Sequence, residues 1–203
     1  MTHSQFFTSH YILLKDGSLG EWPIVEISDS GEVLSIELHP EGLTEKPGMQ
    51  LHGGLLMAGL VDVGFIPDSA KLTQRIINRH FSAGTLFLGT STANSSFLSP
   101  PFLIDSMEDR QCPFPFINRD NDNFEIPLLH RLRLMCSRNS SLNWLDLLNK
   151  AEEWIFDQRS DLSGIGRVEP GNKCGLMVVK NLDLLSMKMT GDMYIKWLSV
   201  PSF

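Results

Sequence analysis

The run Gly53-Gly54-Leu55-Leu56-Met57-Ala58-Gly59-Leu60-Val61-Asp62-Val63 decides how this sequence is interpreted. Its part from 55 to 63 is apolar and flanked by glycines, which is typical of a strand buried on both faces. Strands of this kind belong to parallel sheets that helices cover. We therefore predict one strand over 55–63 and expect a helix to follow it.

The residues after this run fit a strand-helix-strand unit. Asp68-Ser69 can cap a helix whose apolar positions 72, 76, 77 and 81 share a face, and Gly84 ends that helix. The next apolar run, 85–88, predicts a second buried strand. Together these elements have about the size of one βαβ unit.

Short strands are predicted at both ends of the chain. On the N-terminal side the runs 11–14, 22–27 and 33–38 are separated by turn residues and indicate a β-meander. On the C-terminal side we predict strands over 166–169, 176–179 and 194–198. Short strands cannot bury their apolar faces alone, so we expect the strands of the two ends to pack in one β-rich unit.

Two helices are predicted before the C-terminal strands. Pro127 suits the first turn of one helix, and Ser140 or Ser141 can cap the other. The stretch from 91 to 123 is rich in Ser, Asn and Pro and is predicted to be mostly loop, with apolar islands at 97–98, 102–104 and 114–117.

Composition limits the classes of function. The 203 residues include 24 acidic side chains against 17 Lys and Arg, a net charge of -7, which offers no general attraction for nucleic acid or anionic membranes.

The start of the sequence lacks the pattern of a signal peptide, and we expect a cytoplasmic location. The three cysteines are widely spaced, which favours reduced packing residues over disulfides or a thiolate metal site.

Two segments resemble the metal-dependent amidohydrolase superfamily, which includes cytosine deaminase, chlorohydrolase and dihydroorotase relatives. Residues 53–63 are similar to the family's G-x-L-x-x-P-G-x-[VI]-[DN]-x run, with Ala58 in place of Pro. Residues 166–179 are similar to its closing G-x-[IVL]-x-x-G-K-x-A-D-[LI]-x-[VI] segment, with Gly175 where Asp is usual. The resemblance implies a β-sandwich formed by the segments that flank a (β/α)8 barrel.

The resemblance fails at the catalytic site. The family binds its metal first through a His-x-His pair just after the [DN]-x step, and the corresponding residues here are Gly64 and Ile66, which have no metal-binding atoms. We assign 1–57 and 163–203 to the composite sandwich and 58–162 to a reduced α/β barrel. That middle part is too short for a full barrel, which needs about 200 residues or more.

Few residues remain as candidates for chemistry. His52 and His80 are weak candidates for metal ligands, and the other histidines are expected to be solvated or satisfied. Asp105 is a weak catalytic candidate as a strand-end aspartate, although Asp105-Ser106 and the residues after them favour a helix cap. Asp62 matches the family's [DN] position and is expected to be a packing or turn residue.

The leading hypothesis is a degenerate amidohydrolase homologue without hydrolytic activity, which acts as a binding or interaction protein without a cofactor. The alternative is a metal-dependent hydrolase of C–N bonds that uses Zn or another divalent metal in a rebuilt site. A barrel that has lost strands exposes sheet edges and apolar faces, so we expect a homodimer in which the apolar islands pack. A lid formed by the same stretch within one chain is the other possibility. The sequence does not identify a small-molecule ligand.

Overall fold

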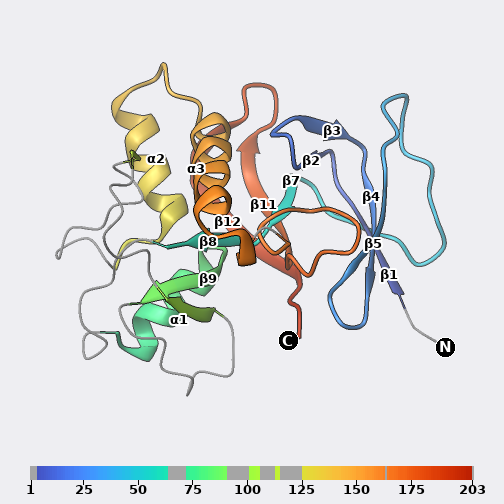
Figure 1. The fold of residues 1–203 in the computed structure, drawn as a ribbon. Helices are drawn as coiled ribbons and strands as arrows, with labels where there is room; N and C mark the ends of the chain where they lie inside the picture. The colour runs from blue at the N-terminus through green and yellow to red at the C-terminus, as the bar shows by residue number, and fades with distance from the viewer. Residues whose placement is uncertain are drawn as a thin grey trace. The chain divides into compact units, whose positions relative to one another are not determined.

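A computed structural model describes residues 4–63, 72–90, 101–105, 113–114, 125–162 and 164–202, with the side chains of Thr90 and Asp105 excepted. The described residues form a mixed α/β protein with strands in three sheets and three α-helices (Figure 1). None of these helices combines the length and the apolar character that crossing a membrane requires.

The chain divides into two compact units. The terminal unit comprises Met1–Gly59 and Arg159–Phe203, and the central unit comprises Leu60–Gln158. The division falls inside the predicted strand 55–63, so the prediction of one continuous strand is wrong. The run forms two strands instead, β7 (Leu55–Ala58) in the terminal unit and β8 (Leu60–Asp62) in the central unit.

Gly59 separates the two strands. Its N–H donates to the carbonyl oxygens of Cys174 and Gly175, at 3.0 and 2.9 Å, in the terminal unit. The next N–H, that of Leu60, donates to the carbonyl oxygen of Gly84 in the central unit. Hydrophobicity is continuous across this point, and therefore the change of hydrogen-bond partners was not visible in the apolar pattern.

The terminal unit contains two sheets. One has the order β5-β4-β1-β6, formed by Val33–Glu37, Ile24–Ser28, Ser4–Thr8 and Gln50–Leu51. The other has the order β12-β11-β7-β2-β3, formed by Lys188–Ser199, Leu176–Asp183, Leu55–Ala58, Tyr11–Leu13 and Leu19–Glu21. The predicted N-terminal meander is wrong, because β2 pairs with β3 and β7 while β4 and β5 lie in the other sheet.

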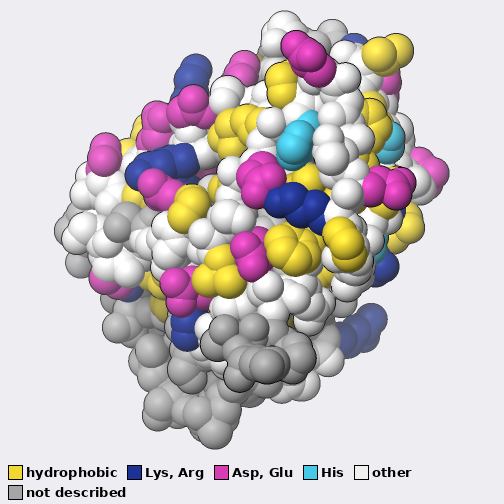
Figure 2. Space-filling model, turned by 90° about the vertical axis from the view of Figure 1, so that its right-hand side faces the viewer, with side chains coloured by type: hydrophobic (Ala, Val, Ile, Leu, Met, Phe, Trp, Pro, Cys, Tyr) yellow, Lys and Arg dark blue, Asp and Glu magenta, His cyan; other side chains and the backbone are white. Residues whose placement is uncertain are grey.

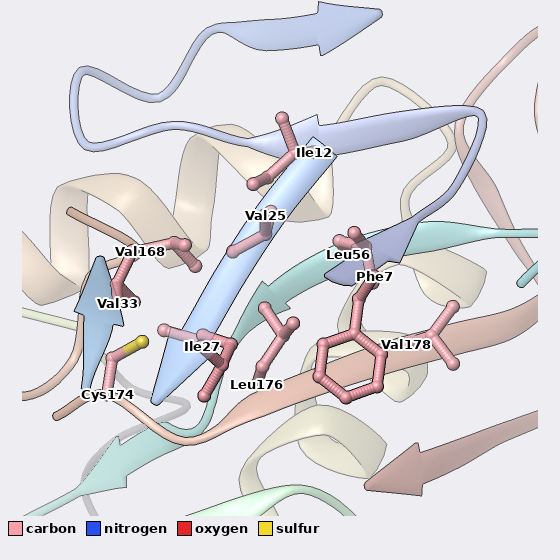
Figure 3. Packing of buried hydrophobic residues seen from close by; sticks show 11 residues of the cluster. Phe7, Ile12, Val25, Ile27, Val33, Leu56, Val168, Cys174, Leu176 and Val178 are labelled. Carbon is pink, nitrogen blue, oxygen red and sulfur yellow. The ribbon is translucent and has the colours of Figure 1, made fainter. Parts of the chain in front are cut away.

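One hydrophobic core joins the two sheets. Phe7, Val25 and Val33 come from the four-stranded sheet, while Leu56 and Val178 come from the five-stranded sheet (Figure 3). All five are almost fully buried. Burial of such side chains contributes about 1.5 to 3 kcal/mol each, so the N-terminal and C-terminal segments stabilise each other through this core.

The C-terminal segment differs from the prediction before β11. Residues 166–169 form no strand. The residues that follow them bond to Val33: the N–H of Val33 donates to the carbonyl oxygen of Asn172, and the N–H of Gly171 donates to the carbonyl oxygen of Val33. A turn at Pro170 and Gly171 follows these residues in place of the strand that the apolar pattern predicted. The predicted strands 176–179 and 194–198 do form, inside the longer hairpin of β11 and β12.

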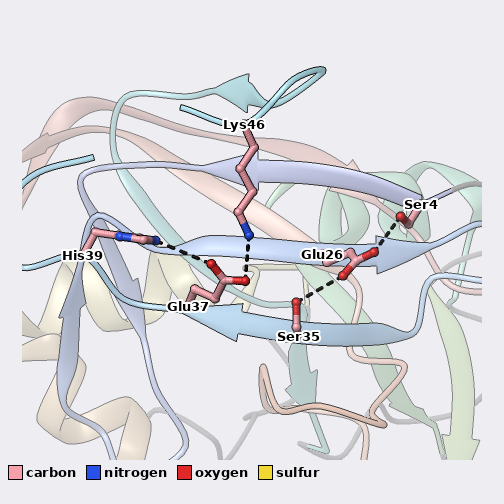
Figure 4. A network of polar contacts seen from close by, with 6 residues as sticks. All are labelled: Ser4, Glu26, Ser35, Glu37, His39 and Lys46. Carbon is pink, nitrogen blue, oxygen red and sulfur yellow. Dashed lines mark hydrogen bonds and ion pairs between the residues drawn. The ribbon is translucent and has the colours of Figure 1, made fainter. Parts of the chain in front are cut away.

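Polar contacts cover the outer side of the four-stranded sheet. Glu26 accepts hydrogen bonds from the hydroxyls of Ser4 and Ser35, and Glu37 accepts one from Lys46 at 2.6 Å (Figure 4). Figure 2 shows hydrophobic, acidic and basic side chains interspersed on the face it presents. Interspersed charges of both signs keep an exposed sheet face solvated.

The central unit is built on a parallel sheet with the order β10-β9-β8, in which β9 is Thr85–Thr90 and β10 is Phe102–Asp105. Helix α1 (Gln74–Ser82) connects β8 to β9 and completes one βαβ unit. Helices α2 (Leu128–Arg138) and α3 (Trp144–Gln158) follow and pack on each other.

The helices begin later than their predicted caps. The Oγ1 atom of Thr73 accepts the N–H of Ile76 and caps α1, whereas Asp68-Ser69 lies outside the described residues. Helix α3 begins at Trp144, where Asn143 Oδ1 accepts the N–H of Leu145, and not after Ser140 or Ser141. Asn and Thr also accept hydrogen bonds at helix starts, so the sequence offered several cap residues.

Candidate functional site

The carboxyl ends of the three parallel strands lie at one edge of the central sheet. Strand β8 ends at Asp62, and β10 ends at Asp105, which pairs with Thr90 at the end of β9. Asp62 itself pairs with Leu88. In open α/β sheets, ligands bind outside the carboxyl ends of the strands, so this edge is the place for a site.

Three ionisable side chains meet at the end of β8. Arg131, in the first turn of α2, donates from Nη2 to Asp62 Oδ1 at 2.8 Å. The other carboxylate oxygen, Oδ2, lies 3.7 Å from Nδ1 of His80 on α1. The side chains of Asp62 and His80 are 0% exposed and that of Arg131 is 8% exposed. The cluster therefore lies in the interior of the central unit.

The charge of Asp62 requires a counter-charge in this environment. Removing a carboxylate from water is unfavourable unless a cation and hydrogen bonds compensate. Arg131 provides the cation through its guanidinium group. Among the described residues, the Nε and Nη1 donors of Arg131 have no hydrogen-bond acceptor although both are buried.

The structure brings one predicted metal candidate, His80, into this cluster. It also places Asp62 there, which the sequence predicted as a packing or turn residue. Arg131 was missed, although a signal existed: it lies between Leu128 and Leu132 on the buried side of α2, where a charged residue needs a partner. No motif or spacing in the sequence indicated which carboxylate that partner is.

His52, the second predicted metal candidate, belongs to the terminal unit, whereas His80 belongs to the central unit. The imidazole of His52 stacks on Phe7, with 6.3 Å between ring centroids, and the residue as a whole is 8% exposed. Burial, with smaller effects of Lys196 and Lys180, lowers the pKa of His52. These properties are those of a buried histidine that packs against an aromatic ring.

Asp105 is the last residue of β10, which is the strand-end position that the catalytic hypothesis required. Its side chain is not described, and Ser106 lies outside the described residues, so the alternative of a helix cap stays a prediction. Gly64 and Ile66 also lie outside the described residues. Within the described ranges, no group of three or more His, Cys, Asp or Glu side chains is arranged to hold a metal ion.

Three further histidines lie among the described residues, while His3 lies outside them. Nδ1 of His10 accepts the N–H of Gly54, and its ring lies 5.1 Å from that of Trp22. His39 lies 3.7 Å from Glu37. His130 on α2 is half-buried, and burial is the main cause of its lowered pKa.

The described cysteines carry free thiols. Burial raises the pKa of Cys174 to about 12 and also raises the pKa of Cys136, which is less buried. Thiols with raised pKa values are poor nucleophiles at neutral pH. Cys112 lies outside the described residues.

Comparison with known proteins gives partial similarities only. No protein-family model and no curated protein matches the chain. Among solved structures, an amidohydrolase from Brucella melitensis is 22% identical over 30% of this chain and 12% of its own length, with a TM-score of 0.26. N-acetyl-D-glucosamine-6-phosphate deacetylase from Mycobacterium smegmatis is 18% identical over 42% of this chain and 24% of its own, with a TM-score of 0.33.

Aminofutalosine deaminase from Helicobacter pylori is 10% identical over 70% of this chain and 40% of its own, with a TM-score of 0.38. The chain thus spans less than half the length of each of these three structures. Similarities of this extent do not assign the chain to a family, and the resemblance found in the sequence stays a prediction.

Proposed function

We propose that this chain is a degenerate amidohydrolase-like protein that lacks hydrolytic activity and acts by binding. The observation that carries the proposal is the buried contact of 2.8 Å between Arg131 Nη2 and Asp62 Oδ1. A guanidinium beside the carboxylate repels a metal cation, and this repulsion is strong where the surroundings exclude water. The strand end at which the family chemistry would begin is therefore occupied by an ion pair, in which Arg131 is the cation.

The sequence supports the same proposal independently. Gly64 and Ile66 stand at the two positions of the family's His-x-His pair, and neither side chain can bind a metal. His80 is the one predicted histidine near the end of β8, and it faces a carboxylate that Arg131 already neutralises. A site that activates water needs several neutral imidazoles or carboxylates around an exchangeable position.

The proposal includes the architecture. The two sheets of the terminal unit share one core, which supports their assignment as a β-sandwich built from both ends of the chain. Strands β8, β9 and β10 with helix α1 would then be the remnant of the barrel. This assignment rests on the two sequence motifs and on the parallel order of the three strands.

The test is a turnover assay of the full chain. We expect no deaminase, amidase or dihydroorotase-type turnover after addition of Zn or Mn. The reason is that Arg131 already neutralises Asp62 at the end of β8, where the metal would have to bind. The assay uses each metal in turn, with a chelator-treated sample as the blank. Turnover that rises with added metal and disappears with the chelator would overturn the proposal in favour of the metal-dependent C–N hydrolase.

A further inference from the structure

Arg131 has two buried hydrogen-bond donors without an acceptor among the described residues. A guanidinium has five N–H groups, and Nη2 of Arg131 donates a hydrogen bond to Asp62 Oδ1 at 2.8 Å. Within the described part of the chain, Nε and Nη1 have no acceptor, although the residue is only 7% exposed. Buried donors in native proteins nearly always have a partner, so this pattern indicates a bound water or ligand.

The location of these donors favours a ligand. Arg131 lies in the first turn of α2, where the helix dipole favours negative charge. Its partner, Asp62, ends β8 at the carboxyl edge of the parallel sheet, where α/β proteins bind ligands. The bond to Asp62 holds the planar guanidinium in one orientation, so a ligand would find its donors already placed.

We propose that Arg131 anchors a binding site for a small carboxylate ligand at the carboxyl end of β8. Nε and Nη1 lie on different edges of the guanidinium, and each shares its edge with one N–H of Nη2. Whichever edge faces Asp62, the other edge therefore offers two adjacent N–H groups, which match the two oxygens of a carboxylate. Asp62 offsets part of the positive charge, and we therefore expect weak binding, with a Kd of about 1 mM. The inference rests on the proposed function, since it gives the ligand class of a protein that binds without hydrolysing.

Acetate is the probe for this site. We would titrate the full chain with sodium acetate in a calorimeter, with sodium chloride at matched ionic strength and with acetamide, a neutral molecule of similar shape. We expect saturable binding of acetate and no binding of acetamide. Arg131→Lys keeps the positive charge but loses the paired N–H donors of the guanidinium, and it should raise the Kd for acetate about tenfold. Arg75→Lys, an exposed arginine of α1, is the matched control and should leave the Kd unchanged.

A second variant keeps the test decisive if Arg131→Lys does not fold. Asp62→Asn with Arg131→Met removes both charges and leaves no buried ion unpaired, so it should unfold cooperatively and bind no acetate. Acetate binding that is equal in wild type and in the double variant would overturn the site. So would the absence of saturable binding in the wild type up to about 100 mM. Metal-dependent turnover is measured separately, so failure of the ligand class and failure of the proposed function are distinguishable.

Discussion

At the scale of the residue, Gly54 shows how closely the two ends of the chain approach. It precedes β7 with φ +129°, and a Cβ atom built on it would overlap the carbonyl oxygen of Val179 on β11. Side chains rarely adopt this backbone conformation. Gly54 therefore has two separate reasons to be glycine, its backbone angle and the strand beside it.

Two alanine substitutions separate these reasons. Gly42 has φ +127° and nothing within 4 Å of its Cβ position, so Gly42→Ala carries the backbone strain alone and should cost about 1 kcal/mol. Gly54→Ala adds the overlap with β11 and should cost about 3 kcal/mol or more. Urea unfolding of both variants measures the difference in the free energy of unfolding. Equal costs would mean that β11 does not lie against Gly54.

His52 makes stability depend on pH. Burial lowers its pKa below the ordinary value of 6.5, so the unfolded chain takes up a proton at higher pH than the folded chain. The contribution of His52 to the free energy of unfolding is complete above about pH 6.5, and it is lost as the pH falls through the lower pKa of the folded state. His52→Gln should thus reduce the loss of unfolding free energy between about pH 7.5 and pH 5.5.

Urea unfolding of wild type and His52→Gln at both pH values checks this expectation. His130, whose pKa burial also lowers, is present in both proteins and leaves a remaining slope of the same sign. An identical loss of stability in the two proteins would show that His52 is protonated equally in the folded and unfolded states.

At the scale of the element, β11 connects the two ends of the chain. It pairs with β7 on one side and with β12 on the other, and its Leu176 and Val178 belong to the shared core. A chain that ends before 163 loses these pairings and exposes the apolar face of the N-terminal strands. We expect it to have no cooperative unfolding transition.

Circular dichroism during heating measures this transition. Leu185→Ser is the control, because Leu185 lies between β11 and β12 and is 99% exposed, so the variant should keep the full transition. If the truncated chain unfolds cooperatively, the N-terminal strands are stable without β11.

Strands were predicted correctly where the local apolar pattern agrees with the sheet pairing in the structure. Residues 85–88, 176–179 and 194–198 form strands because apolar β-formers there are also paired in sheets. The strand 55–63 was wrong because hydrophobicity does not report which sheet accepts each backbone group. The meander failed for the same reason: three adjacent strands were identified, but the division between two sheets depends on long-range pairing.

The candidate site was less accessible from sequence than the strands. His80 and Asp62 were both noted, but one as a metal ligand and the other as a packing residue. Arg131 joins Asp62 from a helix that lies 69 residues later in the chain. No periodicity or motif spacing encodes a contact over that separation, so the buried ion pair emerged only from the structure.

At the scale of the whole molecule, self-association stays a prediction. Of the apolar islands proposed for the interface, 102–104 lies in β10 and is half-buried, while 97–98 and 115–117 lie outside the described residues. We propose a homodimer and expect light scattering at micromolar concentration to give about twice the chain mass of 22.8 kDa. A mass of one chain that persists after tenfold concentration would favour a lid within the monomer.

The metal content of the full chain tests the account most directly. Elemental analysis of protein purified without chelators reports whether a metal or Arg131 provides the positive charge at the end of β8. Because the guanidinium is fixed to Asp62 at 2.8 Å and Gly64 and Ile66 cannot bind metal, we predict well under one equivalent of Zn, Fe or Mn per chain. About one equivalent of any of these metals per chain would contradict the account.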